Sequence, residues 1–143
     1  MKIAVFGLGY VGCVSAACFA KEGHDVIGVD VNPQKVDIIN SGKSPIVELG
    51  LEQIISEVVG TGKLKASINF LQAVNHSDIS LICVGTPSNK NGSVSLEYIL
   101  RVAQQIGEGI KNINHYHVFV IRSTVPPGTL DRAIEIIAES SGK

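Results

Sequence analysis

VFGLGYVGCVSAACFAKEG, the segment at residues 5–23, begins with sixteen uncharged residues behind a Met-Lys start. Two interpretations of this segment predict different structures. It is either a secretory signal peptide, or a strand that turns through glycines into a helix. Lys2 would supply the charged start of a signal peptide, and residues 15–18 (SAAC) resemble a weak lipoprotein cleavage site.

Three glycines argue against the signal peptide. Gly7, Gly9 and Gly12 would break the continuous apolar helix that a signal needs. The segment also leads directly into a second patterned apolar segment, DVIGVD at residues 25–30, which ends in an acid. A strand, a glycine turn and a helix account for more of these residues, so we favour the second interpretation.

The expected strand is KIAVF at residues 2–6, a short apolar run typical of a buried strand. Residues 7–12 then read G-x-G-x-x-G. In the helix that follows, one face carries the apolar periodicity and is expected to be the buried one; its members are Val11, Val14, Ser15, Cys18 and Phe19. Gly23 is the expected left-handed cap of this helix, and residues 25–30 are the expected second strand.

Each glycine of the motif has a mechanical reason. Gly7 permits the tight turn, Gly9 lets the backbone approach a pyrophosphate, and Gly12 lets the helix pack close to the strand. The N-terminus of the helix offers free N–H groups and a partial positive charge to phosphates. The alternative is a glycine-rich turn that binds nothing.

An acid follows the motif at the spacing of a ribose-binding residue. Asp30 lies 18 residues after Gly12, at the end of the second strand, where a carboxylate accepts both hydroxyls of an adenosine ribose. The same charge would repel a 2′-phosphate, which favours NAD over NADP. Lys35 weakens this preference because it offers a compensating positive charge.

Strand and helix patterns alternate through the rest of the chain. Further strands are expected at residues 65–68, 79–84 and 117–122, and helices at about 33–40, 51–59, 70–76, 96–110 and from 129, with Asn32 and Thr129 as N-caps. This alternation predicts an α/β fold, a doubly wound parallel sheet of Rossmann type with strand order 3-2-1-4-5.

Ligands of such sheets bind beyond the carboxyl ends of the strands. Thr86 and Thr124 follow the fourth and fifth strands, so both can point a hydroxyl into the cofactor cleft. The alternative is that these threonines only cap turns or helices. The four histidines form no triad pattern and are expected to be solvent-exposed.

Length and composition indicate one domain, residues 1–143, with enough apolar residues for a core. The net charge of −1, without a basic stripe, gives no indication of nucleic acid or membrane binding. Cys13, Cys18 and Cys83 lack the spacing of a metal site or a disulfide framework. We expect all three to be buried, in a cytoplasmic protein that holds no metal.

Several segments together resemble the UDP-glucose/GDP-mannose dehydrogenase family. They are IAVFGLGYVG (3–12), GHDVIGVDVN (23–32), SGKSPIVELGL (41–51), ICVGTPSNKNG (82–92) and RSTVPPGT (122–129). The resemblance covers essentially the whole chain, in order. The third and fourth segments look most like the members of the family that oxidise GDP-mannose.

The resemblance implies an oxidoreductase of sugar-nucleotide metabolism that serves acidic polysaccharide synthesis. Members oxidise a sugar-nucleotide alcohol to a carboxylate with two NAD, while a cysteine holds the intermediate as a thiohemiacetal and then a thioester. Carried over to this sequence, it places Tyr10 and Val11 at the pyrophosphate, Asp30 and Lys35 at the adenosine ribose, Thr86 along the nicotinamide half, and Thr124 near the nicotinamide and the catalytic water.

The sequence departs from the family in two respects. Leu49 stands where the family usually has proline. The catalytic cysteine of the family lies in a downstream Gly-Gly-x-Cys motif, and none of the three cysteines here lies in such a motif. We therefore interpret residues 1–143 as an amino-terminal NAD-binding domain, cut before the sixth strand, of a longer homo-oligomeric protein.

This domain is expected to bind NAD without turnover, because the catalytic cysteine and the sugar-nucleotide domain are missing. A UDP-glucose 6-dehydrogenase and a non-catalytic NAD-binding module are the alternatives. Without a sixth strand, the strand at residues 117–122 becomes a sheet edge beside Val118 and Val120, and we expect self-association there.

Overall fold

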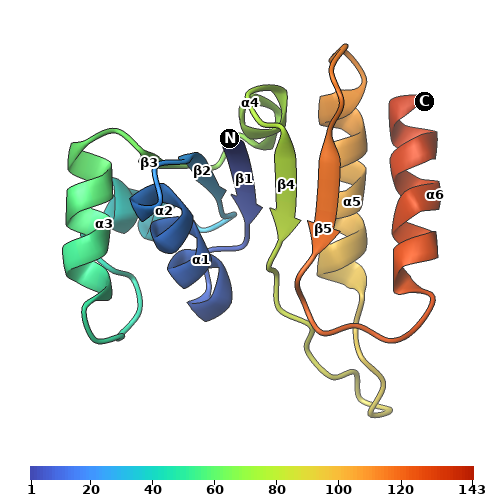
Figure 1. Cartoon of the computed structure of the whole chain (residues 1–143). Helices are drawn as coiled ribbons and strands as arrows, with labels where there is room; N and C mark the ends of the chain where they lie inside the picture. Colours follow the sequence, from blue (N-terminus) through green and yellow to red (C-terminus); the bar gives the residue numbers. More distant parts are fainter.

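The computed structural model describes residues 1–143, arranged around a sheet of five parallel strands. The strands are β1 (Lys2–Phe6), β2 (Asp25–Val29), β3 (Leu64–Ser67), β4 (Ile79–Ile82) and β5 (Val118–Ile121). Their order, β3-β2-β1-β4-β5, confirms the predicted topology (Figure 1). The order reverses between β1 and β4, and a crevice at such a reversal is where doubly wound sheets bind ligands.

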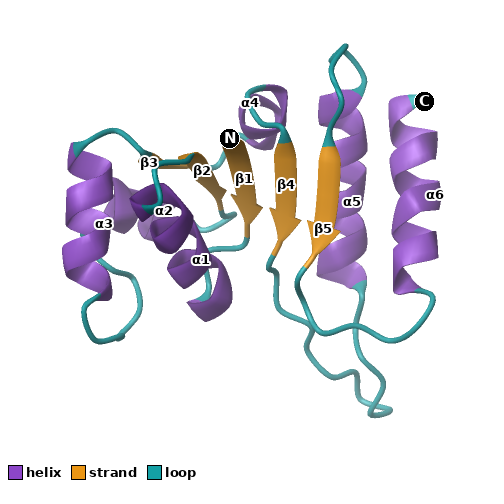
Figure 2. Ribbon diagram, viewed as in Figure 1, coloured by secondary structure: helices purple, strands orange, loops and turns teal.

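Six helices cover the two faces of the sheet (Figure 2). They are α1 (Tyr10–Lys21), α2 (Pro33–Asn40), α3 (Leu51–Gly60), α4 (Phe70–Asn75), α5 (Glu97–Ile110) and α6 (Thr129–Ser141). Alternate residues of β1 divide between two cores: Ile3 and Val5 pack with α1, α2 and α3, while Ala4 and Phe6 pack with α4, α5 and α6. Burial on both faces explains why β1 reads as a continuous apolar run.

The segment at residues 5–23 forms the end of β1, a glycine turn and α1, as the second interpretation predicts. Gly23 has a φ of +90°, which confirms its predicted left-handed conformation after the helix. None of the helices has the length and apolar character needed to cross a membrane.

The buried face of α1 differs from the prediction. Of the predicted face, Val11 and Cys18 are exposed, Val14 and Phe19 are half-buried, and only Ser15 is buried. The residues that α1 buries are small: Gly12, Cys13, Ser15, Ala16, Ala17 and Ala20. Small side chains let the helix lie close to the sheet, and a search for large apolar residues at helical spacing does not detect such a face.

The two predicted N-caps have different outcomes. Asn32 caps α2, because its side-chain oxygen accepts from the N–H of Gln34 at 2.9 Å. The prediction for α6 is wrong: Gly128, with a φ of +83°, precedes the helix, and Thr129 is its first residue. The Thr129 hydroxyl instead donates to the carbonyl of Pro126 at 2.7 Å. A glycine in the left-handed region provides the change of direction, so no capping side chain is needed.

β5 is an edge strand, paired on one side with β4. Val120 lies level with Leu81 of β4, and 40% of Val120 is exposed. In Figure 2 no helix lies in front of β5 on the side of the sheet that carries α1. An apolar edge of this kind offers unpaired backbone groups to another strand.

We expect this 143-residue chain to self-associate through β5 as its concentration rises, and Val120→Lys to shift the equilibrium toward the monomer. Lysine on an edge strand opposes pairing by charge and by desolvation cost. Light scattering over a concentration series measures the average mass. A monomeric mass for the unsubstituted chain at the highest concentration would contradict the prediction.

A histidine joins the amino-terminal ends of β4 and β5. The expectation that all four histidines are exposed is wrong for His24 and His117, which are both half-buried. The half-buried His117 lies with Nδ1 2.9 Å from the carbonyl of Ser77 and Nε2 2.9 Å from the hydroxyl of Ser80. A carbonyl only accepts, so Nδ1 carries the proton and Nε2 accepts from Ser80. Ser80 is fully buried, so this Ser–His pair has no access to a substrate.

Burial lowers the pKa of His117 below its ordinary value, with a smaller effect of the same sign from His115, while the Ser77 carbonyl and Asp78 act in the opposite direction. The unfolded chain therefore takes up a proton first as the pH falls. The contribution of neutral His117 to the free energy of unfolding is complete above about pH 6.5. It is lost as the pH drops from there through the folded-state pKa of His117.

We expect the free energy of unfolding to fall between pH 7.5 and pH 5.5, and His117→Gln to reduce this slope. Urea unfolding at each pH measures it. His76→Gln, at the exposed end of α4, is the matched control and should leave the slope unchanged. Equal slopes for the His117 variant and the parent chain would show that another group controls the pH dependence.

Candidate functional site

The turn between β1 and α1 is built on two glycines that contact other backbone. Gly7 has a φ of +92°, and its N–H donates to the carbonyl of Val29 at 2.8 Å. A Cβ at Gly7 would lie 3.0 Å from the carbonyl oxygen of Cys83. A Cβ at Gly12 would lie 1.8 Å from the carbonyl oxygen of Gly7. The structure therefore supports the mechanical reasons given for both glycines, a tight turn and a close approach of helix to strand.

Gly9 differs from the other two glycines because nothing lies within 4 Å of the position a Cβ would occupy. Its φ of −77° and ψ of −163° suit any residue, so neither the backbone nor the packing requires glycine. The free space lies over the N-terminus of α1, where the first N–H groups of a helix lack partners within the helix. This is the arrangement in which a pyrophosphate approaches the backbone.

Asp30 directly follows β2 and is held by two backbone donors and one ion pair. Its Oδ2 accepts from the N–H of Leu8 at 2.8 Å, and its Oδ1 accepts from the N–H of Asn32 at 2.9 Å. The Nζ of Lys35, on α2, lies 3.6 Å from Oδ2, and only 9% of the Asp30 side chain is exposed. Because a carboxylate oxygen accepts more than one hydrogen bond, both oxygens still have capacity for ligand hydroxyls.

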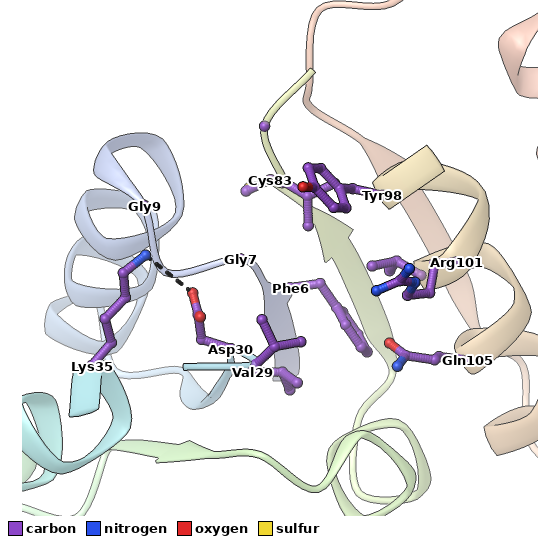
Figure 3. Close-up of a pocket in the computed structure, with 14 residues that line it drawn as sticks. Phe6, Gly7, Gly9, Val29, Asp30, Lys35, Cys83, Tyr98, Arg101 and Gln105 are labelled. Atoms are coloured by element: carbon purple, nitrogen blue, oxygen red, sulfur yellow. Dashed lines mark ion pairs between the residues drawn. The ribbon is translucent and has the colours of Figure 1, made fainter. Parts of the chain in front are cut away.

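These residues border a cavity of about 300 Å³ beyond the carboxyl ends of β1, β2 and β4. Figure 3 shows Asp30 and Lys35 on one side and α5 on the other, with the glycine turn between them. Of the predicted site residues, Gly7, Gly9, Asp30 and Lys35 line the cavity. Half of its lining residues are apolar, which is usual for a small-molecule site.

Tyr10 and Val11 lie at the start of α1, next to the cavity but not in its wall. Both side chains are exposed, 59% for Tyr10 and 42% for Val11, so neither is held in the core. The Tyr10 hydroxyl donates to the carboxylate of Glu48 in the loop before α3. This hydrogen bond and the negative charge of Glu48 raise the pKa of Tyr10.

Thr86 and Thr124 follow β4 and β5 at the carboxyl edge of the sheet, as predicted. Thr86 is half-buried and Thr124 is exposed, and neither lines the cavity that contains Asp30. Their neighbour Ser123 joins the two loops, because its hydroxyl donates to the carbonyl of Val84 at 2.6 Å. The sequence did not single out Ser123, since its role depends on a contact with a loop 39 residues away.

The cysteines correct one expectation and confirm two. Cys13 and Cys83 are buried as predicted, while Cys18 on the outer side of α1 is exposed. Burial raises the pKa of both buried thiols to about 11. Thiols with such pKa values are protonated at neutral pH and are poor nucleophiles.

One wall of the cavity was missed by the sequence analysis. Tyr98, Arg101, Val102 and Gln105 of α5 border the space opposite Asp30. Their spacing of three, four and seven residues places them on one face of the helix. That spacing was visible in the sequence, but polar residues on a helix ordinarily face solvent, so it carried no indication of a site.

The sheet order and the glycine turn between β1 and α1 place the chain in the class of Rossmann-type dinucleotide-binding domains. A family model described as "UDP-glucose/GDP-mannose dehydrogenase family, NAD binding domain" matches residues 1–143. The chain therefore belongs to this family, as its NAD-binding domain.

Two dehydrogenases of this family are similar to this chain over nearly its whole length. GDP-mannose 6-dehydrogenase of Pseudomonas aeruginosa is 51% identical over 144 residues, which cover 100% of this chain and 33% of that protein. UDP-glucose 6-dehydrogenase of Rhizobium meliloti is 40% identical over 142 residues, 99% of this chain and 32% of that protein. The chain thus spans about a third of the length of these relatives.

A solved structure agrees with the sequence comparison. The crystal structure of a ternary complex of GDP-mannose dehydrogenase from Pseudomonas aeruginosa matches with a TM-score of 0.98 at 51% identity, covering 100% of this chain and 33% of that one. The predicted fold class and the predicted cofactor, NAD, are both confirmed.

Proposed function

We propose that this chain is the NAD-binding part of an enzyme that oxidises GDP-mannose to GDP-mannuronate. The observation that carries the proposal is the difference in identity, 51% to a GDP-mannose 6-dehydrogenase against 40% to a UDP-glucose 6-dehydrogenase. Converting an alcohol to a carboxylate removes two hydrides, so the reaction consumes two NAD. The product is an acidic sugar nucleotide, suited to acidic polysaccharide synthesis.

The residues from the glycine turn to the end of β2 suit the pyrophosphate and the adenosine ribose of NAD. The pyrophosphate lies over Gly9 and receives hydrogen bonds from the N–H groups of Tyr10 and Val11. The open space at Gly9 supports this placement. The adenosine ribose binds Asp30, whose charge favours a ribose with free hydroxyls over one with a 2′-phosphate. Lys35 holds the Asp30 carboxylate from the other side.

The nicotinamide half extends from the pyrophosphate toward Thr86 and Thr124. The position of both residues at the carboxyl edge, after β4 and β5, supports this direction. NAD supplies the hydride acceptor, and these threonines orient it with their hydroxyls. Thr124 also lies near the water that the reaction consumes.

The 143-residue chain binds NAD but does not turn over sugar nucleotide. The buried thiols of Cys13 and Cys83, with pKa values of about 11, are unsuited to act as the nucleophile. The exposed Cys18 lies outside the Gly-Gly-x-Cys motif of the family. The sugar nucleotide is held by parts of the longer protein beyond the third that this chain matches. We place the longer protein in the cytoplasm as a homo-oligomer; the three free cysteines suit a reducing compartment.

Two assays test the proposal. Titration calorimetry of this chain should show binding of NAD and much weaker binding of NADP. The protein that contains this domain and the family's remaining domains should then reduce NAD with GDP-mannose faster than with UDP-glucose. Faster turnover with UDP-glucose would assign the alternative activity, and turnover with neither sugar would support a non-catalytic NAD-binding module.

A further inference from the structure

The face of α5 that borders the cavity has no role in the contacts described so far. Arg101 and Gln105 supply its polar groups, and Tyr98 and Val102 complete it. Figure 3 shows the guanidinium of Arg101 and the amide of Gln105 directed into the cavity from α5, across from Asp30. Two polar groups of different chemistry on one face suggest a ligand with both a flat surface and a hydrogen-bonding edge.

The position of Asp30 indicates which part of the dinucleotide reaches this face. A ribose bound to Asp30 carries its base on the side away from the pyrophosphate, in the space between the end of β2 and α5. Val31, the residue after Asp30, lines this space, and 84% of Val31 is exposed. An exposed apolar side chain at the rim of a cavity offers contact area to the face of a base.

Arg101 is held in place by its own helix. Its Nη2 donates to Oε1 of Glu97, one turn earlier, at 2.8 Å. This contact restricts the long side chain, and the guanidinium plane remains free to stack on a ring. Gln105, one turn later, carries a carboxamide with one acceptor and two donor hydrogens.

We propose that α5 recognises the adenine base of NAD, with Arg101 stacking on one face of the ring against Val31 and Gln105 reading its edge. A glutamine amide pairs with the N6 amino group and the N7 acceptor of adenine. Hypoxanthine, which has a carbonyl in place of the amino group, presents an acceptor where Gln105 requires a donor. The inference rests on the NAD site proposed above and adds specificity for the base.

Dinucleotide analogues separate base recognition from cofactor binding in general. Calorimetry compares NAD with nicotinamide hypoxanthine dinucleotide for the 143-residue chain. We expect NAD to bind more tightly by at least about fivefold. Gln105→Ala should reduce the preference to near unity. Gln104→Ala is the matched control, because Gln104 is exposed on the same helix and lies outside the cavity.

Substitutions of Arg101 separate stacking by the planar guanidinium from the effect of its positive charge. Arg101→Ala should lower the affinity for both dinucleotides by about fivefold or more, because stacking on the ring is lost. The ratio of the two affinities should stay unchanged, because both rings stack alike. Arg101→Lys should not restore affinity, because an ammonium lacks the planar surface. Circular dichroism confirms that each variant is folded.

The outcomes distinguish failure of the inference from failure of the NAD site. Normal NAD binding with an unchanged base preference in Gln105→Ala and unchanged affinity in Arg101→Ala would overturn base recognition by α5 and leave the NAD site intact. Full rescue by lysine would show that Arg101 contributes only charge, which overturns stacking. Absence of NAD binding in the parent chain would overturn both.

Discussion

Gly12→Ala is expected to destabilise the domain by about 4 kcal/mol or more, enough to unfold much of the chain. The new Cβ would lie 1.8 Å from the Gly7 carbonyl oxygen and 3.0 Å from its carbonyl carbon. Both are backbone atoms, so no side-chain rotation relieves the overlap, and α1 would have to move away from β1. The gain in helix propensity from glycine to alanine is only about 1 kcal/mol.

Urea unfolding followed by circular dichroism measures this effect. Gly9→Ala is the control, since it adds the same methyl group three residues earlier, where nothing lies within 4 Å. Gly9→Ala should keep the unfolding midpoint close to that of the parent chain. It should lower the affinity for NAD, because the methyl group enters the space of the pyrophosphate. Equal stability of Gly12→Ala and the parent would contradict the close contact between α1 and the turn.

Asp30→Ala is expected to lower NAD affinity by about a hundredfold. Two hydrogen bonds from ribose hydroxyls to a carboxylate contribute about 3 kcal/mol together, and each 1.4 kcal/mol is a factor of ten. The affinity for NADP should fall much less, because the variant also removes the repulsion between Asp30 and the 2′-phosphate. The ratio of NAD to NADP affinity should therefore fall.

Calorimetry with both dinucleotides gives the ratio. Asp30 also accepts from the N–H groups of Leu8 and Asn32, so the variant will be less stable and must be compared at a temperature where it is folded. Asp37→Ala, on the exposed side of α2, removes an equal charge outside the cavity and should leave both affinities unchanged. Undiminished NAD binding by Asp30→Ala would place the ribose elsewhere.

Local patterns were sufficient for most of the fold. The alternation of short apolar runs with helical periodicity predicted all five strands, and the right-handed crossover rule then led to the observed order. Asn32 with Pro33 and the positive φ of Gly23 were also predictable, because a cap or a left-handed residue acts on its own neighbours. Thr129 was assigned wrongly because Gly128 ends the preceding loop first.

The candidate site was predictable on the side formed by neighbouring residues. Gly7, Gly9 and Asp30 belong to one β-turn-α-β unit, and their spacing is enough to bring them together. Arg101 and Gln105 come to the same cavity from about 70 residues farther along the chain, through the packing of α5. No local pattern records that approach.

The parallel sheet, the glycine turn and the acid at the end of β2 follow from local sequence patterns, because each depends on backbone conformation within one supersecondary unit. Three other features come from the packing of separate elements: the buried face of α1, the pairing of His117 with Ser80, and the closure of the cavity by α5 opposite Asp30. These three features depend on how closely separate elements pack. That distance is set by the volumes of side chains far apart in sequence.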